Sequence, residues 1–372
     1  MVANTYLPVR NGVTVSAAGW TAGLRELGCD VDVWTVSVTD PGLEGVFATR
    51  GAGQLAAGFP APLSLRPPRA VRARRYDVVH AHHPVILGPA AANLAETSGA
   101  AFVATAHSDY LGYLDDYAPA ALRPTGTALG RKMMRRFFDR CACVLAPSSA
   151  IAATLKRWGV SAPVERCVYP VDDERLSPLP RSQAREALGL DAGLPLALYA
   201  GRVAAEKGLD DLVAEFEAAR DLAPGALLAI AGDGPRAAHL HAAVKRLGLS
   251  HTVRFLGALE PAELGRWYCA ADVHVSASPA EVGPLTVVEA AACATPSVGY
   301  RVAGFEDRIA HGATGLLAAR EPGALATALA ELLSDRERAH AMGRAAREAA
   351  TGNTPRAAAE TLLGSYERAL AR

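Results

Sequence analysis

The sequence lacks any run of about 18 apolar residues and any basic segment followed by an apolar stretch at its start. We therefore expect neither a membrane-spanning helix nor a secretory signal, and we expect a cytoplasmic protein. The formal net charge is zero, which argues against a general attraction to nucleic acid. Zinc-binding cysteine spacing is also lacking, because only Cys141 and Cys143 among the six cysteines are close, so buried free thiols are expected.

The chain does have enough length and apolar material for two domains. It has 372 residues, and 50% of them are hydrophobic. Residues 1–190 carry 20 basic and 16 acidic residues, whereas residues 191–372 carry 18 and 22. This modest asymmetry fits an N-terminal half that meets something anionic, and chance explains it nearly as well.

Short β-branched runs alternate with longer Ala- and Leu-rich segments throughout the chain. This alternation predicts repeated βα units, and therefore α/β domains with parallel, doubly wound sheets covered by helices on both faces. The expected strands are Val31–Val38, Asp77–Ala81, Ala101–Thr105, Cys143–Ala146, Leu196–Ala200, Ala226–Ala231, Val253–Phe255, Val273–Ser276 and Ser297–Tyr300. The expected helices are Thr14–Leu27, Pro89–Thr97, Leu209–Arg220, Arg236–Leu247, Pro261–Cys269 and Pro284–Cys293.

One segment is a good candidate for the linker between two domains. Tyr169–Pro180 holds three prolines and an acidic run. We expect an N-terminal acceptor-binding domain over residues 1–175 and a C-terminal nucleotide-sugar domain over residues 176–372, with the last helix able to pack back on the first domain. Because Met1–Asn4 offers only a stub of a first strand, we expect either a start a few residues upstream or a frayed strand.

The segment Glu281–Glu289 carries the strongest chemical signal. A strand ends just before it, a loop with Gly283 follows, and a helix is expected to begin near Pro284 and Leu285. The first turn of a helix offers unpaired N–H groups and a positive dipole end, which suits a diphosphate. The two carboxylates could then hold sugar hydroxyls on either side. The alternative is an ordinary surface loop followed by a helix with solvated acids.

Two further strand ends carry glycine-containing turns. Gly201–Gly208 places Arg202 and Lys207 after a buried strand, where a leaving phosphate needs cations. The alternative for these bases is a solvated turn. Gly232 begins a second strand-to-helix turn, Gly232–Pro235, which is not a dinucleotide-binding fingerprint.

Three other patterns have structural alternatives that we favour. His80, His82, His83 and His107 could suggest a metal, but core histidines are the preferred interpretation, since no nearby acid or cysteine completes a ligand set. Asp30-Val-Asp32 spells D-x-D at the edge of an expected strand, so no metal site is predicted there. Residues 131–140 combine five bases with an apolar stripe of Met133, Met134, Phe137 and Phe138, which fits either a membrane-surface helix or a helix packed on the sheet.

Taken in order, these elements resemble the GT-B fold glycosyltransferases of family four, which are retaining enzymes. The resemblance covers nearly the whole chain. It rests on Tyr6–Val13, Asp77–Ala81, Thr105–His107, Gly201–Gly208, Gly232–Pro235, Phe255–Gly257 and the Glu281/Glu289 pair. It implies two Rossmann-like domains that face each other across a cleft holding the active site.

The resemblance also implies roles for individual residues. Arg202 and Lys207 would contact the donor diphosphate, with Gly201, Gly232, Gly283, Pro284 and Leu285 around it. Glu281 would contact the donor sugar and Glu289 the ribose. Asn11 and Gly12 would approach the donor from the other domain, and His107 would lie beside the transferred sugar. The catalytic set is then His107, Arg202, Lys207 and Glu281.

The N-terminal half is most similar to the branch that glucosylates diacylglycerol, through its Asn11-Gly12-Val13 entry and the run Thr105–Tyr110. Asp109 and Tyr110 are the acceptor-binding candidates. Relatives of that branch also glycosylate soluble natural products. The family often has Phe where Val282 stands and a loop N–H where Pro284 stands, which puts the donor sugar in doubt.

The expected reaction is retaining transfer from a nucleoside diphosphate sugar, such as a UDP-hexose or UDP-N-acetylhexosamine. The acceptor would be a hydroxyl of a lipid or small molecule, and no metal or other cofactor is expected. Residues 131–140 could make weak peripheral contact with the inner face of a membrane. A sugar-nucleotide epimerase or hydrolase on the same fold is the alternative activity, and a non-catalytic membrane-associated binding module is another alternative.

Overall fold

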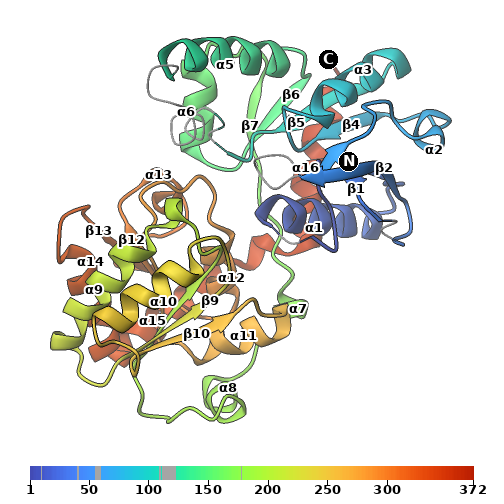
Figure 1. The fold of residues 1–372 in the computed structure, drawn as a ribbon. Helices are drawn as coiled ribbons and strands as arrows, with labels where there is room; N and C mark the ends of the chain where they lie inside the picture. Colours follow the sequence, from blue (N-terminus) through green and yellow to red (C-terminus); the bar gives the residue numbers. More distant parts are fainter. Residues whose placement is uncertain (10, 40–41, 55–59, 109, 111–122, 177) are drawn as a thin grey trace. The chain divides into compact units, whose positions relative to one another are not determined.

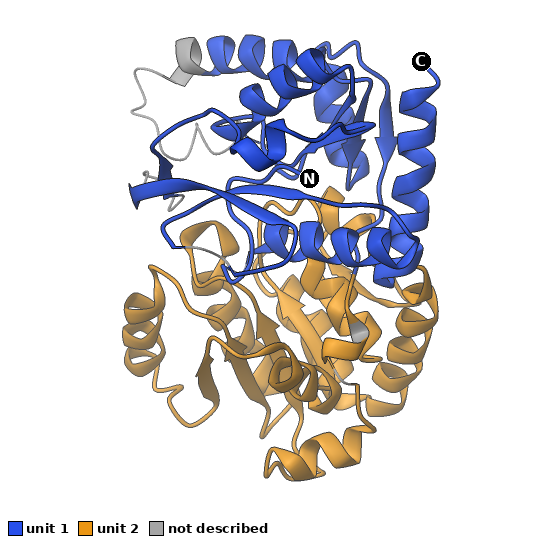
Figure 2. Cartoon of the chain, turned by 90° about the vertical axis from the view of Figure 1, so that its right-hand side faces the viewer, with its two compact units in different colours: residues 1–170, 353–372 blue, residues 171–352 orange. Residues whose placement is uncertain are grey.

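The computed structural model describes the chain except for residues 10, 40–41, 55–59, 109, 111–122 and 177 (Figure 1). The chain divides into two compact units, residues 1–170 with 353–372 and residues 171–352 (Figure 2). Each unit is a Rossmann-like α/β unit, so the fold class predicted from the sequence is confirmed. The chain passes from the first unit to the second after Pro170. The sequence had suggested a boundary five residues later, after residue 175. None of the described helices is long and apolar enough to span a bilayer.

The first unit is built on a mainly parallel sheet whose two parts meet at the start of the chain. One part has the order β4-β5-β6-β7 and the other the order β1-β2-β3. Val2 bridges Trp34 in β1 and Ala81 in β4, so the expected stub is the first strand, reduced to one bridged residue. The strands are β1 (Val33–Ser37), β2 (Val46–Gln54), β3 (Pro60–Pro62), β4 (Val78–Ala81), β5 (Ala101–Thr105), β6 (Cys143–Ala146) and β7 (Val164–Arg166).

The last helix of the chain belongs to this first unit. α16 (Pro355–Leu370) packs on α1 (Gly12–Glu26), where a Cβ on Gly23 would collide with the backbone of Pro355. It buries Leu362 and Tyr366 against the unit. The other helices described here are α2 (Arg69–Arg72), α3 (Leu87–Ser98), α5 (Arg123–Phe138) and α6 (Ser149–Arg157).

Burial along helix α5 shows that the apolar stripe proposed from the sequence was wrong at one of its four residues. Met134, Phe137 and Phe138 are buried, whereas the side chain of Met133 is 55% exposed beside Leu129 at 59%. Because successive helical residues are rotated by about 100°, the spacing i, i+3, i+4 puts the three buried residues on one face and turns Met133 away. The helix packs against its unit and still presents two large apolar side chains to solvent.

The second unit contains a six-stranded, fully parallel sheet in the order β10-β9-β8-β11-β12-β13. The chain runs outward from β8 to β10, returns to the middle at β11, and then runs outward in the other direction. The point where the order reverses lies between β8 and β11, and ligands of such sheets bind at the carboxyl ends of the strands there. The strands are β8 (Leu196–Ala200), β9 (Leu227–Ala231), β10 (Val253–Gly257), β11 (Val273–Ser276), β12 (Ser297–Tyr300) and β13 (Gly315–Ala318).

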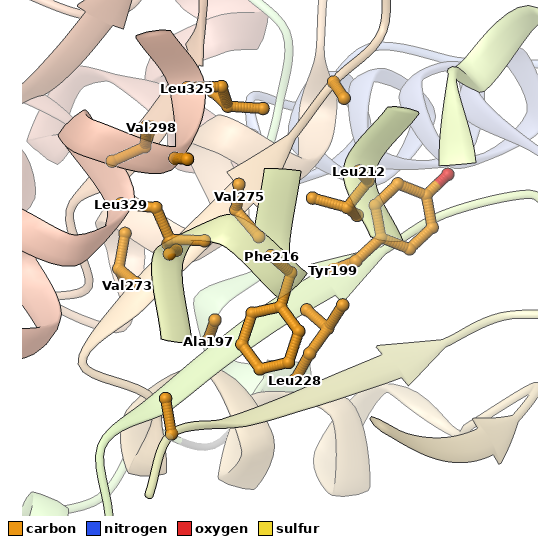
Figure 3. Close-up of a cluster of buried hydrophobic side chains, with 14 of the residues drawn as sticks. Ala197, Tyr199, Leu212, Phe216, Leu228, Val273, Val275, Val298, Leu325 and Leu329 are labelled. Atoms are coloured by element: carbon orange, nitrogen blue, oxygen red, sulfur yellow. The ribbon is translucent and has the colours of Figure 1, made fainter. Parts of the chain in front are cut away.

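Both faces of this sheet are buried, as the continuous apolar runs predict. Along β8, Ala197 and Tyr199 point into one cluster, and Leu196 and Leu198 point into the cluster on the other face. Figure 3 shows the first cluster, where Phe216 lies against the strands. The helices are α7 (Asp173–Leu176), α8 (Arg181–Ala187), α9 (Leu209–Leu222), α10 (Ala237–Arg246), α11 (Pro261–Ala270), α12 (Leu285–Ala292), α13 (Ala303–Glu306), α14 (Ala324–Ser334) and α15 (Arg336–Ala349).

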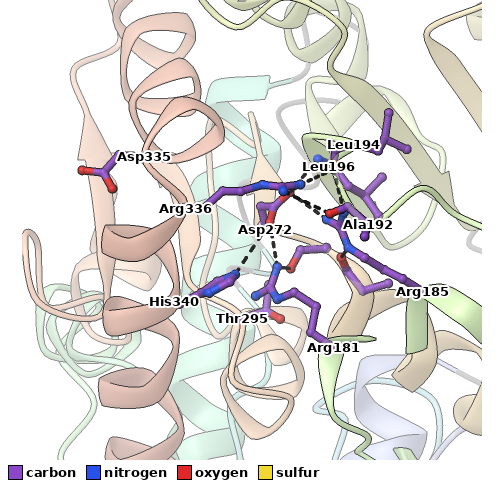
Figure 4. A network of polar contacts seen from close by, with 12 residues as sticks. Arg181, Arg185, Ala192, Leu194, Leu196, Asp272, Thr295, Asp335, Arg336 and His340 are labelled. Atoms are coloured by element: carbon purple, nitrogen blue, oxygen red, sulfur yellow. Dashed lines mark hydrogen bonds and ion pairs between the residues drawn. The ribbon is translucent and has the colours of Figure 1, made fainter. Parts of the chain in front are cut away.

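A buried carboxylate ties several elements together at the amino end of this sheet (Figure 4). Asp272, which directly precedes β11, is fully buried. Its Oδ1 lies 2.8 Å from Arg181 Nη1, and its Oδ2 lies 2.9 Å from Arg185 Nη2. Oδ2 also accepts from the amide of Leu196 at 2.9 Å. Because the carboxylate has partners on both oxygens, it fixes α8 to the amino ends of β8 and β11.

Candidate active site

Two of the predicted site residues form an ion pair at the reversal point of the second sheet. Lys207 ends a 3₁₀ turn that follows β8, and Glu281 lies in the loop that follows β11. Lys207 Nζ donates to Glu281 Oε1 at 2.7 Å. The exposed fractions of the two side chains are 29% and 12%, so the pair is partly desolvated. The sequence motifs thus meet in space at the edge where a ligand is expected.

Arg202 brings a second cation to the same edge of the sheet. Its side chain is 60% exposed, and Nη1 lies 3.9 Å from Glu206. Its carbonyl oxygen accepts a hydrogen bond from the buried Tyr199 hydroxyl at 2.9 Å, which anchors the loop after β8 to the strand. A guanidinium that is accessible on a fixed backbone can engage two phosphate oxygens at once.

Glycines let the loop after β8 approach the loop after β9, and the segment after β12 approach the loop after β11, at backbone distance. A Cβ on Gly232, where φ is +144°, would collide with the carbonyl of Gly201. A Cβ on Gly304 would likewise collide with the carbonyl of Glu281. The amide of Gly201 donates to the carbonyl of Ala231 at 2.9 Å, so this loop continues the pairing of its strand. The backbone of Glu281 can therefore lie this close to α13 only because Gly304 has no side chain.

Helix α12 begins at Leu285, with Pro284 as its N-cap residue and Gly283 in the loop before it. The N-cap residue Pro284 makes no side-chain hydrogen bond to the first turn of the helix. The first-turn amides of a helix lack intrahelical acceptors and lie at its positive end. The anion seat at this end stays a prediction from the sequence, and α12 is the helix that follows β11.

Glu289 lies one turn into α12 and has a partner that sequence reasoning missed. The hydroxyl of Tyr268, on α11, donates to Glu289 Oε2 at 2.9 Å. Burial raises the pKa of the Glu289 carboxyl, and the hydrogen bond from Tyr268 opposes that rise. No motif signals this pair, because an aromatic residue in an apolar helix is usually core.

In the first unit, Asn11 is committed to starting a helix. Its Oδ1 accepts from the amide of Thr14 at 3.0 Å, and its own amide donates to the Thr14 hydroxyl at 2.8 Å. This capping box explains why α1 starts at Gly12, two residues before the expected start at Thr14. Asn11 Nδ2 donates to Thr5 Oγ1 at 3.2 Å, so both ends of the side-chain amide are already paired.

The histidines of the first unit form a buried cluster, as preferred from the sequence. His82 Nδ1 and His107 Nε2 are 3.0 Å apart, and His107 Nδ1 lies 2.9 Å from the Tyr169 hydroxyl. Trp20 stacks on His82 with ring centroids 5.8 Å apart. Burial is the main cause that lowers the histidine pKa values, to about 3 for His80 and well below the usual range for His82 and His107. These rings are therefore neutral near pH 7.

Neutral rings fix the direction of the hydrogen bonds in this chain. His82 Nε2 lies 3.3 Å from the Met1 Sδ, and a thioether accepts but does not donate. His82 Nε2 therefore carries the proton, its Nδ1 accepts from His107 Nε2–H, and His107 Nδ1 accepts from Tyr169. Both ring nitrogens of His107 are engaged, so a substrate hydroxyl reaches either nitrogen only by replacing His82 or Tyr169.

The two acceptor-binding candidates have different outcomes. Asp109 lies outside the described residues. Tyr110 is described, and it lies half-buried three residues beyond His107. Tyr110 and His107 both lie in the segment that follows β5 in the first unit. Acceptor binding by Tyr110 stays a prediction.

The positions considered for a metal have other partners. Asp32 accepts from Arg74 Nη1 at 2.8 Å and from the Tyr76 hydroxyl at 2.8 Å, at the amino end of β1. Among the residues that the structure describes, no group of three or more His, Cys, Asp or Glu side chains is placed to hold a metal ion. All six cysteines are free, and all but Cys29 are buried, as expected.

Comparison with known protein families gives a match for each half of the chain. The family described as "Glycosyltransferase Family 4" matches residues 10–175, and the family described as "Glycosyl transferases group 1" matches residues 180–349. The two matches together leave few residues unassigned, and the second contains every donor-site candidate from Gly201 to Glu289.

Curated relatives agree with these matches. The chain is 30% identical over 384 residues to the GDP-mannose-dependent alpha-mannosyltransferase of Mycobacterium tuberculosis, an alignment that covers 99% of this chain and 95% of that protein. It is 32% identical over 273 residues to D-inositol 3-phosphate glycosyltransferase 2 of Catenulispora acidiphila, covering 69% of this chain. The chain spans only 62% of the Catenulispora protein's length.

Solved structures share the fold. Sucrose-phosphate synthase from Thermosynechococcus elongatus superposes with a TM-score of 0.82 at 22% identity, covering 100% of this chain and 99% of that one. HepE from Anabaena, in complex with UDP-glucose, superposes with a TM-score of 0.77 at 18% identity, covering 98% of each chain.

Proposed function

We propose a specific reaction for this chain, which belongs to the glycosyltransferases of family 4 and group 1 and transfers a sugar from a nucleotide sugar. The donor is a UDP-linked hexose or N-acetylhexosamine, the acceptor is a hydroxyl of a small molecule or lipid, and the anomeric configuration is retained. The Lys207–Glu281 pair at the reversal point of the second sheet carries this proposal. Lys207 Nζ and Glu281 Oε1 lie 2.7 Å apart, and in this proposal the lysine serves the diphosphate and the glutamate serves the sugar.

The residues suggest how the reaction proceeds. Arg202, Lys207 and the first-turn amides of α12 would stabilise the negative charge that develops on the departing diphosphate. The acceptor oxygen would attack C1 from the side that the phosphate leaves. The bond from C1 to the phosphate oxygen breaks, the bond from C1 to the acceptor forms, and the acceptor's proton passes to the leaving phosphate oxygen. This route needs no base from the protein.

The experiment that tests the donor is a thermal-shift panel with UDP-glucose, UDP-galactose, UDP-N-acetylglucosamine and GDP-mannose. We expect the largest stabilisation from one of the UDP-sugars. The linkage formed with that donor is then read by NMR for the configuration at C1. A shift with GDP-mannose alone would overturn the uridine assignment, and an inverted product would overturn retention.

We expect activity to survive excess EDTA. The cations that face the diphosphate in this proposal are the Arg202 and Lys207 side chains. The D-x-D carboxylate of Asp32 is paired with Arg74 at the amino end of β1. The measurement is the initial rate of nucleoside diphosphate release with and without EDTA. A rate that vanishes with EDTA and returns with Mg²⁺ or Mn²⁺ would contradict the mechanism.

The exposed face of α5 tests the class of acceptor. Leu129, Lys132, Met133 and Arg136 share one helical face, and all four are exposed. Arg135 pairs with Asp139 at 3.2 Å, so the charge of that base is already compensated. We expect weak, salt-sensitive binding to vesicles with anionic lipid, at about 1 kcal/mol per engaged base.

The matched variants reverse two charges on a helix. Lys132→Glu with Arg136→Glu should abolish co-sedimentation with anionic vesicles, whereas Lys245→Glu with Arg246→Glu on α10 should leave it unchanged. If the unmodified protein stays out of the pellet even at low salt, the prediction of peripheral membrane binding is wrong and the acceptor is a soluble metabolite.

A further inference from the structure

Tyr268 is a buried tyrosine whose hydroxyl reaches the candidate donor site. It lies near the end of α11, it is completely inaccessible to solvent, and it donates to Glu289 Oε2 on the neighbouring helix at 2.9 Å. Burial raises the pKa of the Tyr268 hydroxyl well above its usual value, so the group stays protonated and always donates. Glu289 is therefore held through one oxygen by a donor that does not titrate.

The surroundings of Tyr268 fix its ring and backbone. Its carbonyl accepts from the Thr295 hydroxyl at 2.6 Å, which ties the end of α11 to the segment after α12. Its ring packs edge-on against His274, with ring centroids 5.9 Å apart. His274 Nδ1 in turn lies 3.0 Å from the Ser297 hydroxyl, in the next strand. A side chain held on these sides cannot swing away from Glu289 without disturbing the sheet.

Glu289 itself is only half-buried as a residue. A glutamate side chain has several rotatable bonds, and holding it in one conformation costs entropy unless another group fixes it. The hydrogen bond from Tyr268 uses Oε2 and leaves Oε1 as the oxygen that can accept from a ligand. A fixed acceptor discriminates between a ligand with a hydroxyl at that point and one without.

We propose that Tyr268 is a positioning residue that orients Glu289 to select a donor nucleotide whose ribose carries its 2′ and 3′ hydroxyls over one that lacks them. This inference rests on the proposed function and on the ribose contact that the family resemblance implies for Glu289. Tyr268 does not touch the nucleotide; it acts through the carboxylate. Its effect is therefore on the preference between two sugars of the nucleotide, which a purely structural tie between α11 and α12 would not change.

The experiment measures the affinity of the full chain for UDP and GDP and for the 2′,3′-dideoxy form of each by calorimetry. The readout is the ratio of the two affinities for the nucleotide that binds. We expect the unmodified protein to prefer the ribonucleotide by about tenfold or more, since hydrogen bonds to a charged group are lost in the dideoxy form. Glu289→Ala should remove this preference, and Tyr268→Phe should reduce it by about threefold or more. The ratio is insensitive to partial unfolding, because both ligands meet the same folded fraction.

Two controls separate the possible outcomes. Tyr366→Phe removes a buried hydroxyl that lies 2.7 Å from His80 in the first unit, and it should leave the ratio unchanged. Tyr268→Phe should have no further effect on the ratio in a Glu289→Ala background, because the tyrosine acts through the glutamate. If Glu289→Ala removes the preference and Tyr268→Phe keeps it, the positioning role is wrong and the ribose contact stands. If Glu289→Ala keeps the preference, the ribose contact fails and the inference fails with it.

Discussion

We expect replacement of Lys207 or Arg202 by Ala to lower turnover by about 10²-fold or more, because each variant would lose the charge-assisted contact that we propose with the leaving diphosphate. Such contacts act most strongly in the transition state, where charge moves onto the phosphate, so kcat falls rather than KM alone rising. The measurement is the steady-state rate of nucleoside diphosphate release at saturating donor. Near-normal turnover in both variants would remove these bases from the mechanism.

The two variants differ in a way that separates catalysis from stability. Lys207→Ala also leaves Glu281, whose side chain is 12% exposed, without its cation. Arg202 is 60% exposed and lies 3.9 Å from its nearest carboxylate, so Arg202→Ala should leave the melting temperature unchanged. Lys245→Ala on α10, an exposed base in the same unit, is the matched control and should retain full turnover.

Replacing Asp272 by Ala destabilises the second unit by about 3–5 kcal/mol, because removing one partner of a buried ion pair leaves the other charge uncompensated. Arg185 is the charge at stake, since its side chain is 4% exposed and lies 2.9 Å from the carboxylate. The amide of Leu196 would also lose its acceptor. The measurement is the urea midpoint followed by circular dichroism, with amide hydrogen exchange of peptides that contain β8 and β11 to place the loss in this unit.

An exposed carboxylate of the same unit provides the control. Asp210 is 52% exposed and pairs with Arg236 at 2.7 Å. Asp210→Ala should change stability by no more than about 1 kcal/mol, as exposed ion pairs usually do. If Asp272→Ala shifts the midpoint no more than Asp210→Ala does, the network around Asp272 does not hold the sheet.

The regular parts of the fold could be predicted from the sequence. Leu196–Ala200, Val273–Ser276 and Ser297–Tyr300 are strands with the expected bounds, because both their faces are buried and the apolar run is unbroken. The edge pair β2 and β3 was missed. Glycines interrupt the apolar pattern of β2, and β3 begins and ends with proline, which is tolerated at a sheet edge.

The candidate donor site was predictable for a different reason. Lys207 and Glu281 are 74 residues apart, but each lies in the connection after a strand with a recognisable pattern, and the topology then brings them together. Tyr268 and Tyr169 carry no such signal. One lies inside an apolar helix and the other in a proline-containing linker, and their roles depend on hydrogen bonds to Glu289 and His107 that only the packing creates.

The return of α16 to the first unit has a consequence for the order in which the protein is made. Residues 171–352 are continuous, so the second unit has its whole sequence once residue 352 has left the ribosome. The first unit has only residues 1–170 at that moment, and the face of α1 that α16 covers is still bare. Domains usually finish folding in the order of synthesis. Here the first unit is completed after the second, because it also needs residues 353–372.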